Sequence, residues 1–346
     1  MPVLKSLSLL FFTATLFLLS ACGKQAQTVT LQGETMGTSY TVKYLSDGLD
    51  LPEPEIMQAQ IDDLLQEVNR QMSTYQPDSE ISQFNQIRNI NRPLPISADF
   101  AGVTAEAMRL NQVTQGALDV TVGPLVNLWG FGPDKEVTYS PTAAEIEQAA
   151  QAVGIDKIVL VNDGQSSTLA KTQADVYLDL SSIAKGFGVD KVAQHLEKSG
   201  IRNYLVEIGG ELYGKGNNAS GETWRVGIEQ PNIVQGSGTQ IIVPLDNQSL
   251  ATSGDYRNFH LDDNGNRLSH IINPQTRAPI RHKLASVSVI ADNTATADGL
   301  STGLFVLGEE KALALAEQYG WAVFLIIYDG NGYKTEMSSA FKKLVN

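Results

Sequence analysis

Residues 296–302 read Thr-Ala-Asp-Gly-Leu-Ser-Thr and begin an apolar segment that predicts a helix ending at residue 307. Positions i, i+3 and i+4 of a helix share one face, so Asp298, Ser301 and Thr302 would direct a carboxylate and two hydroxyl groups to one point. Such oxygen ligands suit Mg2+ better than Zn2+. A local structural role is the more common alternative, because an acid near a helix start favours the helix dipole and Ser or Thr can bond back to helix carbonyls.

The segments around this helix predict a mixture of helices and hairpins. Expected helices are 55–72, 98–115, 183–199 and 309–319, and expected strands are 158–161, 176–180, 204–208, 224–229, 239–245, 257–261, 285–290 and 321–328, with a strand pair in 29–44 broken at 33–37. A further helix begins at a capping box of Thr142 and Glu145 and ends at Gly154. Polar turns are expected at 251–257 and 263–266. Because helices and strands do not alternate strictly and no linker divides the chain, we expect one α+β domain over residues 29–346.

The composition describes a globular chain with an acidic balance. It has 346 residues, of which 42% are hydrophobic, and this is enough for a sizeable core. The net charge is −13, with acids spread along the chain, which argues against nucleic-acid binding because that requires a basic face. An anionic small molecule remains compatible as a ligand, since a pocket can be locally positive.

The N-terminal residues have the layout of a bacterial secretion signal. Lys5 precedes an apolar run at 7–19, which is too short for a comfortable transmembrane helix and leads into Leu19-Ser20-Ala21-Cys22. This tetrapeptide resembles the lipobox of bacterial lipoproteins, in which the Cys becomes the acylated, palmitate-bearing first residue. We therefore expect a signal peptide at 1–21 and a lipidated tether at 22–28, with an ordinary signal peptide as the alternative. Cys22 is the only cysteine, so no thiol remains for a disulfide or a Cys-bound metal.

A second polar cluster lies where an expected strand meets an expected helix. Residues 178–188 read Leu-Asp-Leu-Ser-Ser-Ile-Ala-Lys-Gly-Phe-Gly. Free N–H groups at the helix start, together with Lys185, would form a phosphate site, and the glycines would let a ligand approach closely. The alternative, which is at least as common, is that Asp179 and Ser182 only cap the helix.

The motifs that the sequence lacks narrow the chemistry. It has no Gly-x-Ser-x-Gly and no His-Glu-x-x-His, and its four histidines lack zinc-ligand spacing. His270 could line a pocket, although a structural hydrogen bond is the safer expectation.

Taken together, a series of segments in order along the chain resembles the ApbE family, the FAD:protein FMN transferases of the bacterial periplasm. The segments are Thr-Met-Gly-Thr-Ser-Tyr (35–40), Met-Ser-Thr-Tyr (72–75) with 79–85, Gly-Ala-Leu-Asp-Val-Thr-Val-Gly-Pro-Leu (116–125), 178–186, Glu-Ile-Gly-Gly-Glu (207–211), Trp-Arg-Val-Gly-Ile (224–228), 251–258, Ser-His-Ile-Ile-Asn-Pro (269–274) and the Asp298 helix. The order of the segments over nearly the whole mature chain makes this resemblance specific. Asn273 and Gly299 depart from the commonest family residues, which are Asp and Ala.

The resemblance implies both a fold and an activity. The fold is an α+β domain of two lobes, with mixed and antiparallel sheets and FAD in the cleft. The activity is Mg2+-dependent transfer of the FMN half of FAD to a threonine hydroxyl, releasing AMP. The implied targets are subunits of Na+-translocating NADH:quinone reductase or Rnf-type complexes, and the implied location is periplasmic, lipid-anchored, with the inner membrane favoured and the outer not excluded. Two alternatives remain, an FAD pyrophosphatase giving FMN and AMP and a non-catalytic FAD-binding lipoprotein.

The resemblance also implies the site residues. For Mg2+ they are Asp298, Thr302, the backbone carbonyl of Ser182 and, less directly, Ser301. For FAD they are Met36, Tyr75, Ala117, Leu118, Asp119, Asp179, Lys185, His270 and Ile271. Asp298 would also help to deprotonate the acceptor threonine, although a metal-bound carboxylate is a weak base.

Overall fold

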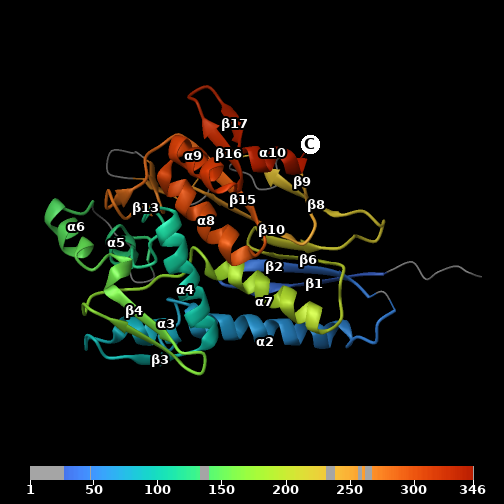
Figure 1. Cartoon of the computed structure of the whole chain (residues 1–346), viewed down its shortest axis with the longest axis horizontal. Helices are drawn as coiled ribbons and strands as arrows, with labels where there is room; N and C mark the ends of the chain where they lie inside the picture. Colours follow the sequence, from blue (N-terminus) through green and yellow to red (C-terminus); the bar gives the residue numbers. More distant parts are fainter. Residues whose placement is uncertain are drawn as a thin grey trace, which may run out of the picture.

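The structure is a computed structural model of the chain, and it describes residues 27–46, 48–132, 140–230, 238–255, 259–261 and 267–345. Its centre is an eight-stranded sheet in which every neighbouring pair is antiparallel (Figure 1). The spatial order of the strands is β1 (Thr28–Thr35), β2 (Thr38–Leu45), β6 (Tyr204–Ile208), β7 (Glu211–Lys215), β10 (Gln248–Gly254), β15 (Leu284–Ala291), β16 (Ala322–Tyr328) and β17 (Tyr333–Met337).

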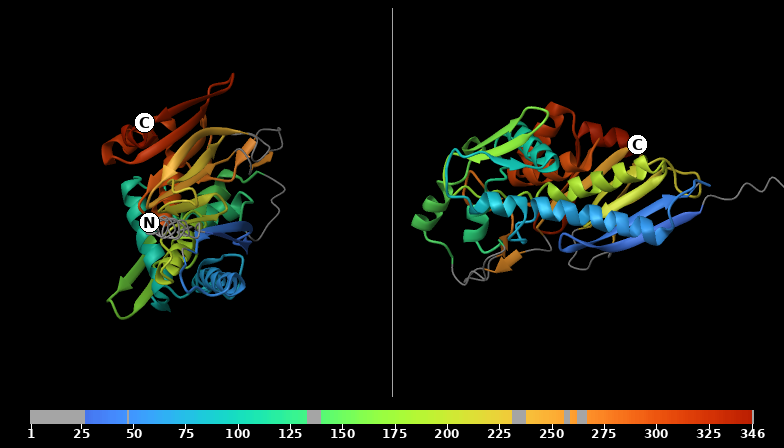
Figure 2. Two further views of the ribbon diagram at one scale, coloured as in Figure 1. Left: turned by 90° about the vertical axis from the view of Figure 1, so that its right-hand side faces the viewer. Right: turned by 90° about the horizontal axis from the view of Figure 1, so that it is seen from below.

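The two faces of this sheet are covered differently. One face packs against the helices α2 (Pro54–Met72), α7 (Ala184–Lys198), α8 (Thr294–Leu307) and α9 (Glu309–Tyr319). Figure 2 shows α2 and α7 side by side along the sheet. Part of the other face, over β10, β15 and β16, is covered by the hairpin β8 (Trp224–Glu229) and β9 (Thr239–Leu245) and by α10 (Ser339–Val345).

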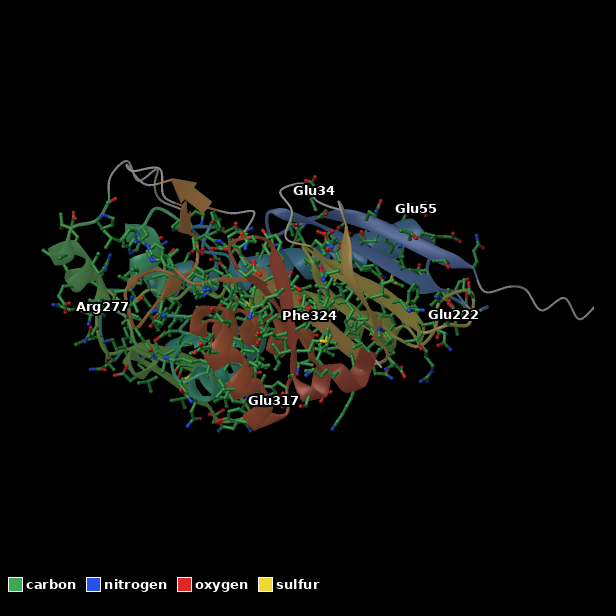
Figure 3. All side chains as sticks on the ribbon, turned by 90° about the horizontal axis from the view of Figure 1, so that it is seen from above. Glu34, Glu55, Glu222, Arg277, Glu317 and Phe324 are labelled. Atoms are coloured by element: carbon green, nitrogen blue, oxygen red, sulfur yellow. The ribbon has the colours of Figure 1, made fainter. Side chains whose placement is uncertain are left out.

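This difference explains the residue patterns of the strands. In β16, Val323 and Leu325 pack in the core under α8 and α9, whereas Phe324 packs in the core under the β8–β9 hairpin. A strand covered on both faces is apolar throughout, and Phe324, labelled in Figure 3, is fully buried. β2 is covered on one face, so buried Tyr40 and Val42 alternate with less buried residues.

A second lobe lies between α2 and α7 in the sequence. Its elements are α3 (Glu80–Gln86), β3 (Leu94–Ile96), α4 (Ala98–Val113), α5 (Gly123–Leu128), α6 (Ala143–Ala150), a short 3-10 helix (Ile155–Lys157), β4 (Ile158–Asn162) and β5 (Ser167–Lys171). Two short hairpins, β11 (Phe259–Leu261) with β12 (Arg267–Ser269) and β13 (Ile272–Asn273) with β14 (Ala278–Pro279), complete the described chain. The lobe joins the sheet layer through α4, which packs on α8. The expected α+β class with antiparallel sheets is confirmed.

Most of the expected elements are confirmed. Strands 204–208, 224–229 and 239–245 and helix 309–319 have the expected bounds, and the Thr142–Glu145 capping box is present. Several short elements were not expected from the sequence, among them α3, α5, α10, β3, β5, β7 and β17. The expected turn at 263–266 and residues 1–26, with Cys22, lie outside the described residues. None of the described helices is both long enough and apolar enough to span a bilayer.

Two expectations are wrong, and both errors have a local cause. Residues 176–180 do not form a strand, because the side chain of Asn85 takes the hydrogen bonds that a neighbouring strand would make. Asn85 Nδ2 donates to Leu178 O (2.9 Å), and Leu178 N donates to Asn85 Oδ1 (2.8 Å). Residues 251–254 belong to strand β10 instead of a turn. Their hydroxyl groups are accommodated within the fold, since Thr252 Oγ1 hydrogen-bonds Ser288 Oγ on β15 (2.7 Å).

Candidate functional site

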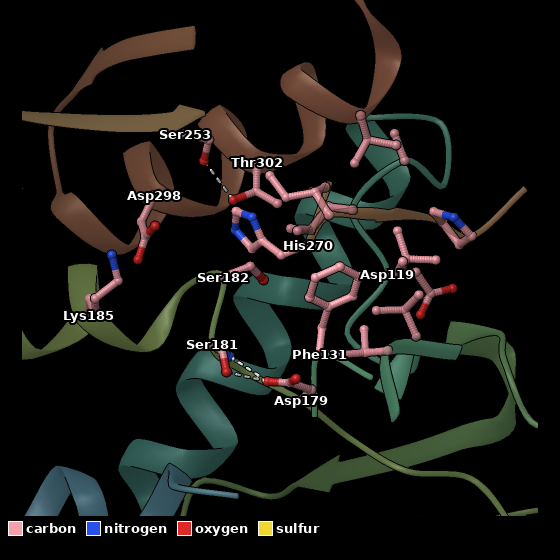
Figure 4. Close-up of a pocket in the computed structure, with 18 of the residues that line it drawn as sticks. Asp119, Phe131, Asp179, Ser181, Ser182, Lys185, Ser253, His270, Asp298 and Thr302 are labelled. Atoms are coloured by element: carbon pink, nitrogen blue, oxygen red, sulfur yellow. Dashed lines mark hydrogen bonds between the residues drawn. The ribbon is translucent and has the colours of Figure 1, made fainter. Parts of the chain in front are cut away.

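A cavity of about 400 Å3 lies where the two lobes meet, and Figure 4 shows many of its side chains. The second lobe contributes the loop after α2, the turn before α5 and the segment before α7. The sheet layer contributes the start of β7, the end of β10, the β13 region and α8. The site is therefore assembled from segments that are distant in the sequence.

Asp298 reaches the cavity from α8 and is 3% exposed. It does not serve the helix start, because Asn293 accepts from Thr296 N (2.8 Å) and Asp190 accepts from the backbone N–H groups of residues 294 and 295. The Asp298 Oδ2 atom instead accepts from Gly186 N on α7 at 2.9 Å. The dipole interpretation of Asp298 is therefore wrong, and its carboxylate joins two helices at the cavity wall.

The two hydroxyl residues of this helix that were expected at the metal site differ in their positions. Thr302 lines the cavity, and its Oγ1 hydrogen-bonds Ser253 Oγ of β10 at 2.9 Å (Figure 4). Ser301 is fully buried, donates to Asp298 O (2.9 Å) and hydrogen-bonds Ser253 Oγ (2.8 Å). Ser301 therefore has the local structural role, in which a hydroxyl group bonds back to its own helix. Thr302 faces the cavity together with Asp298.

Lys185 lies in the first turn of α7 and pairs with Glu211. Its Nζ is 2.7 Å from Glu211 Oε1, and the Glu211 side chain is only 3% exposed. Burial lowers the pKa of Lys185, but the carboxylates of Glu211 and Asp298 raise this pKa more, so the net change is upward. Burial raises the pKa of Asp298 well above its ordinary value, and Glu211 raises it further.

The start of α7 is not capped by Asp179 or Ser182, which was the structural alternative for these two residues. Its N-cap residue is Ile183, whose side chain makes no capping hydrogen bond, and the first-turn N–H of Gly186 is accepted by Asp298 of α8 instead. Asp179 Oδ1 instead accepts from Ser181 N (2.9 Å) and from the Ser181 hydroxyl, which orders the turn (Figure 4). Asp179 and Ser182 both line the cavity. The turn is thus held from within and presents its polar groups to the cavity.

Asp119 lines another part of the cavity wall, with Ala117 and Leu118. Its Oδ1 accepts from Thr121 N (2.8 Å) and Thr121 Oγ1 (2.6 Å). Burial raises the pKa of Asp119, while the hydrogen bonds from Thr121 act in the opposite direction. The backbone of Ile155 also hydrogen-bonds this carboxylate, so Asp119 is fixed in the cavity wall by more than one residue.

The remaining expected residues fall into two groups. Tyr75, His270 and Ile271 line the cavity, and Tyr75 is 71% exposed in the loop after α2. Met36 lies in the β1–β2 turn and packs toward Gly188 of α7, outside the set that lines the cavity.

Several lining residues were not among those expected for the site, and Glu211, Ser253 and Phe131 are three of them. Glu211 follows two glycines at the start of β7, Ser253 lies on β10, and Phe131 lies after α5. The segments that contain Glu211 and Ser253 belong to the family pattern, which is the signal that could have pointed to these two residues. Neither residue type in isolation indicated a role, since the partners Lys185 and Thr302 are distant in the chain.

The chemistry of the cavity fits a hard cation. Within the described ranges, no group of three or more His, Cys, Asp or Glu side chains could hold a metal ion. A site at Asp298 would therefore combine one carboxylate with hydroxyl and carbonyl oxygens, a donor set that Mg2+ accepts. The buried carboxylates of Asp298 and Glu211 share one ammonium, that of Lys185, so a cation would balance the remaining negative charge.

Comparison with known proteins gives consistent matches over nearly the whole chain. The ApbE family pattern matches residues 36–325. The FAD:protein FMN transferase of Haemophilus influenzae is 52% identical over 326 residues, covering 94% of each chain, and that of Vibrio cholerae is 47% identical over 333 residues, covering 96% of this chain and 97% of the other. The solved flavin transferase ApbE from Vibrio cholerae has a TM-score of 0.83 and 45% identity, covering 92% of this chain and 99% of that one. The apo flavinyl transferase ApbE of Pseudomonas stutzeri has a TM-score of 0.85 and 40% identity, covering 93% and 98%.

Proposed function

The chain belongs to the ApbE family and is a flavin-transferring enzyme, and we propose that it moves the FMN half of FAD to a threonine hydroxyl of a target protein in a Mg2+-dependent reaction. The observation that carries this proposal is the convergence of Asp298, Thr302 and Lys185 with the turn at Asp179 on one cavity. That arrangement suits a substrate whose reactive centre is a pyrophosphate.

The transfer exchanges a phosphoanhydride bond for a phosphoester bond. The threonine oxygen forms a bond to the FMN phosphorus, the bond from that phosphorus to the bridging oxygen breaks, and AMP leaves with that oxygen. The hydroxyl proton passes to a base, a role that we propose for Asp298. Asp298, Thr302 and the Ser182 carbonyl would hold Mg2+, which neutralises charge on the phosphates when bound. Ser301 is the least suited of the proposed ligands, because its hydroxyl already bonds Asp298 O and Ser253.

The other expected residues would bind FAD itself. Lys185 would face a phosphate, and Asp119 and Asp179 would accept hydrogen bonds from donors of the flavin or the adenine. Tyr75 would pack on a ring, a role that its exposure at the cavity permits. Met36 would contribute only if the β1–β2 turn moved toward the ligand, and His270 and Ile271 would border the bound molecule.

Two alternatives share the same cavity, an FAD pyrophosphatase and an FAD-binding lipoprotein without catalysis. The test is incubation with FAD, Mg2+ and a subunit of a Na+-translocating NADH:quinone reductase or an Rnf-type complex. Flavin fluorescence on the subunit in a denaturing gel, lost when its acceptor threonine is replaced by alanine, supports transfer. Free FMN without labelling would indicate hydrolysis, and intact FAD would indicate binding alone.

We also propose that the mature protein is periplasmic and held to a membrane by a lipid on Cys22. The support is the lipobox-like Leu19-Ser20-Ala21-Cys22 after a short apolar run. Cys22→Ser should move the protein from the membrane fraction to the soluble periplasmic fraction. Unchanged membrane retention of the variant would remove the lipid anchor from the proposal.

A further inference from the structure

Glu211 is a cavity residue that neither the proposed metal site nor the proposed FAD contacts include. It lies at the start of β7 with 2% of its surface exposed, and its Oε1 is 2.7 Å from Lys185 Nζ. Its Oε2 atom is buried and has no hydrogen-bond partner among the described residues. Burying a carboxylate is costly, so its position against Lys185 requires an explanation.

Lys185 has a second carboxylate within its electrostatic reach. Its side chain extends toward Asp298 in Figure 4, and the Asp298 carboxylate contributes to the raised pKa of Lys185. Nevertheless, the ion pair that Lys185 makes within the described part of the chain is with Glu211. Asp298 instead accepts a hydrogen bond from the Gly186 backbone.

This inference rests on the proposed function, in which Asp298 holds a divalent cation. We propose that Glu211 is a positioning residue that neutralises Lys185 and thereby leaves the Asp298 carboxylate to the cation. An ammonium without a partner in this buried site would be drawn to Asp298, since opposite charges attract strongly where water is excluded. A cation would then have to displace the ammonium before it could bind. Glu211 removes that competition.

The test is Mn2+ binding to the purified full-length protein without FAD, followed by the electron paramagnetic resonance signal of free Mn2+. Glu211→Gln keeps the shape of the side chain but removes its charge, so we expect Mn2+ affinity to fall about tenfold or more. The double variant Glu211→Gln/Lys185→Gln removes the competing ammonium as well. We expect its affinity to return to within about threefold of wild type, because the pair is again neutral.

The double variant separates this role from a merely structural one. If Glu211 only supports the packing of β7, removing the Lys185 charge will not restore the affinity. The matched control is Asp99→Asn, which unpairs Lys191 of the same helix, where Nζ lies 2.9 Å from Asp99 Oδ2. Its Mn2+ affinity should equal that of wild type, and circular dichroism should show all variants folded.

The outcomes distinguish the inference from the proposed function. Absence of Mn2+ binding in wild type, or wild-type binding in Asp298→Asn, would overturn the metal site and this inference with it. If Asp298→Asn loses Mn2+ while Glu211→Gln binds as tightly as wild type, the role of Glu211 alone is overturned. A weakened Glu211→Gln that the second substitution does not rescue overturns it as well.

Discussion

Gly186 lies where α7 meets the start of α8, and the space beside it does not admit a side chain. A Cβ at this position would lie 2.3 Å from Thr294 O, 2.6 Å from Thr294 C and 2.8 Å from Asp298 Cβ. The closest two of these are backbone atoms, so a change of rotamer cannot relieve the overlap. We predict that Gly186→Ala separates the two helices and breaks the 2.9 Å hydrogen bond from Gly186 N to Asp298 Oδ2.

The size of the effect follows from three contributions. Overpacking of a rigid contact costs about 1–3 kcal/mol, and the loss of a buried hydrogen bond costs about 1–2 kcal/mol. The better helix propensity of alanine returns about 1 kcal/mol. We therefore expect Gly186→Ala to lower the free energy of unfolding by about 1–4 kcal/mol. We also expect it to lose flavin transfer, because the position of Asp298 changes.

The matched control is Gly188→Ala, two residues along the same helix. A Cβ there would meet Met36 Cε at 2.9 Å and Ile208 Cδ1 at 3.3 Å, which are the ends of side chains that can move. Its stability should stay within about 1 kcal/mol of wild type, since the gain in propensity offsets the crowding. Urea unfolding followed by tryptophan fluorescence measures both variants. Equal stability of the two would refute the reasoning from backbone contact.

Three further predictions concern the cavity and the second lobe. Asp298→Asn keeps an acceptor for Gly186 N, so we expect an unchanged unfolding midpoint but a loss of flavin transfer of about 100-fold or more in the gel assay, and an active variant would contradict the assignment. Asn85→Ala leaves the Leu178 amide and carbonyl unpaired, so urea unfolding should show a loss of about 2–4 kcal/mol, and a loss below about 1 kcal/mol would contradict the role of Asn85. Burial lowers the pKa of Lys171 to about 8. Between pH 8 and the pKa of an unfolded-state lysine, near 10.4, the unfolded chain binds more protons than the folded chain. The free energy of unfolding should therefore rise by about 1.5 kcal/mol from pH 8 to pH 9.5. Lys171→Met should lack this rise, and an equal slope in both proteins would show that other groups cause it.

The sequence predicts those parts of the fold in which a residue pattern repeats. β16 is apolar throughout because both of its faces are covered, and α2 carries a regular apolar stripe, so both were expected. β10 was mistaken for a turn because its Thr252 and Ser253 are polar. Their partners are Ser288, Ser301 and Thr302, and no local pattern reveals a partner so distant in the chain.

The site was predictable to the extent that its residues belong to a family pattern. The helical spacing correctly places Asp298 and Thr302 toward one cavity, but it gives Ser301 the same weight, although Ser301 bonds back to its own helix. The pairing of Lys185 with Glu211 depends on how α7 lies against β7, so it required the tertiary structure.

β17 has a consequence for where the chain can be shortened. The family match ends at residue 325, within β16, and the cavity residues all precede that point. β17 pairs along β16 and carries the exposed Lys334 and the half-buried Glu336, so a charged strand closes the edge of an otherwise apolar strand. A chain cut after β16 would keep every residue of the site but would expose the unpaired edge of an apolar strand, which favours aggregation. The residues needed for solubility therefore extend beyond those that form the site.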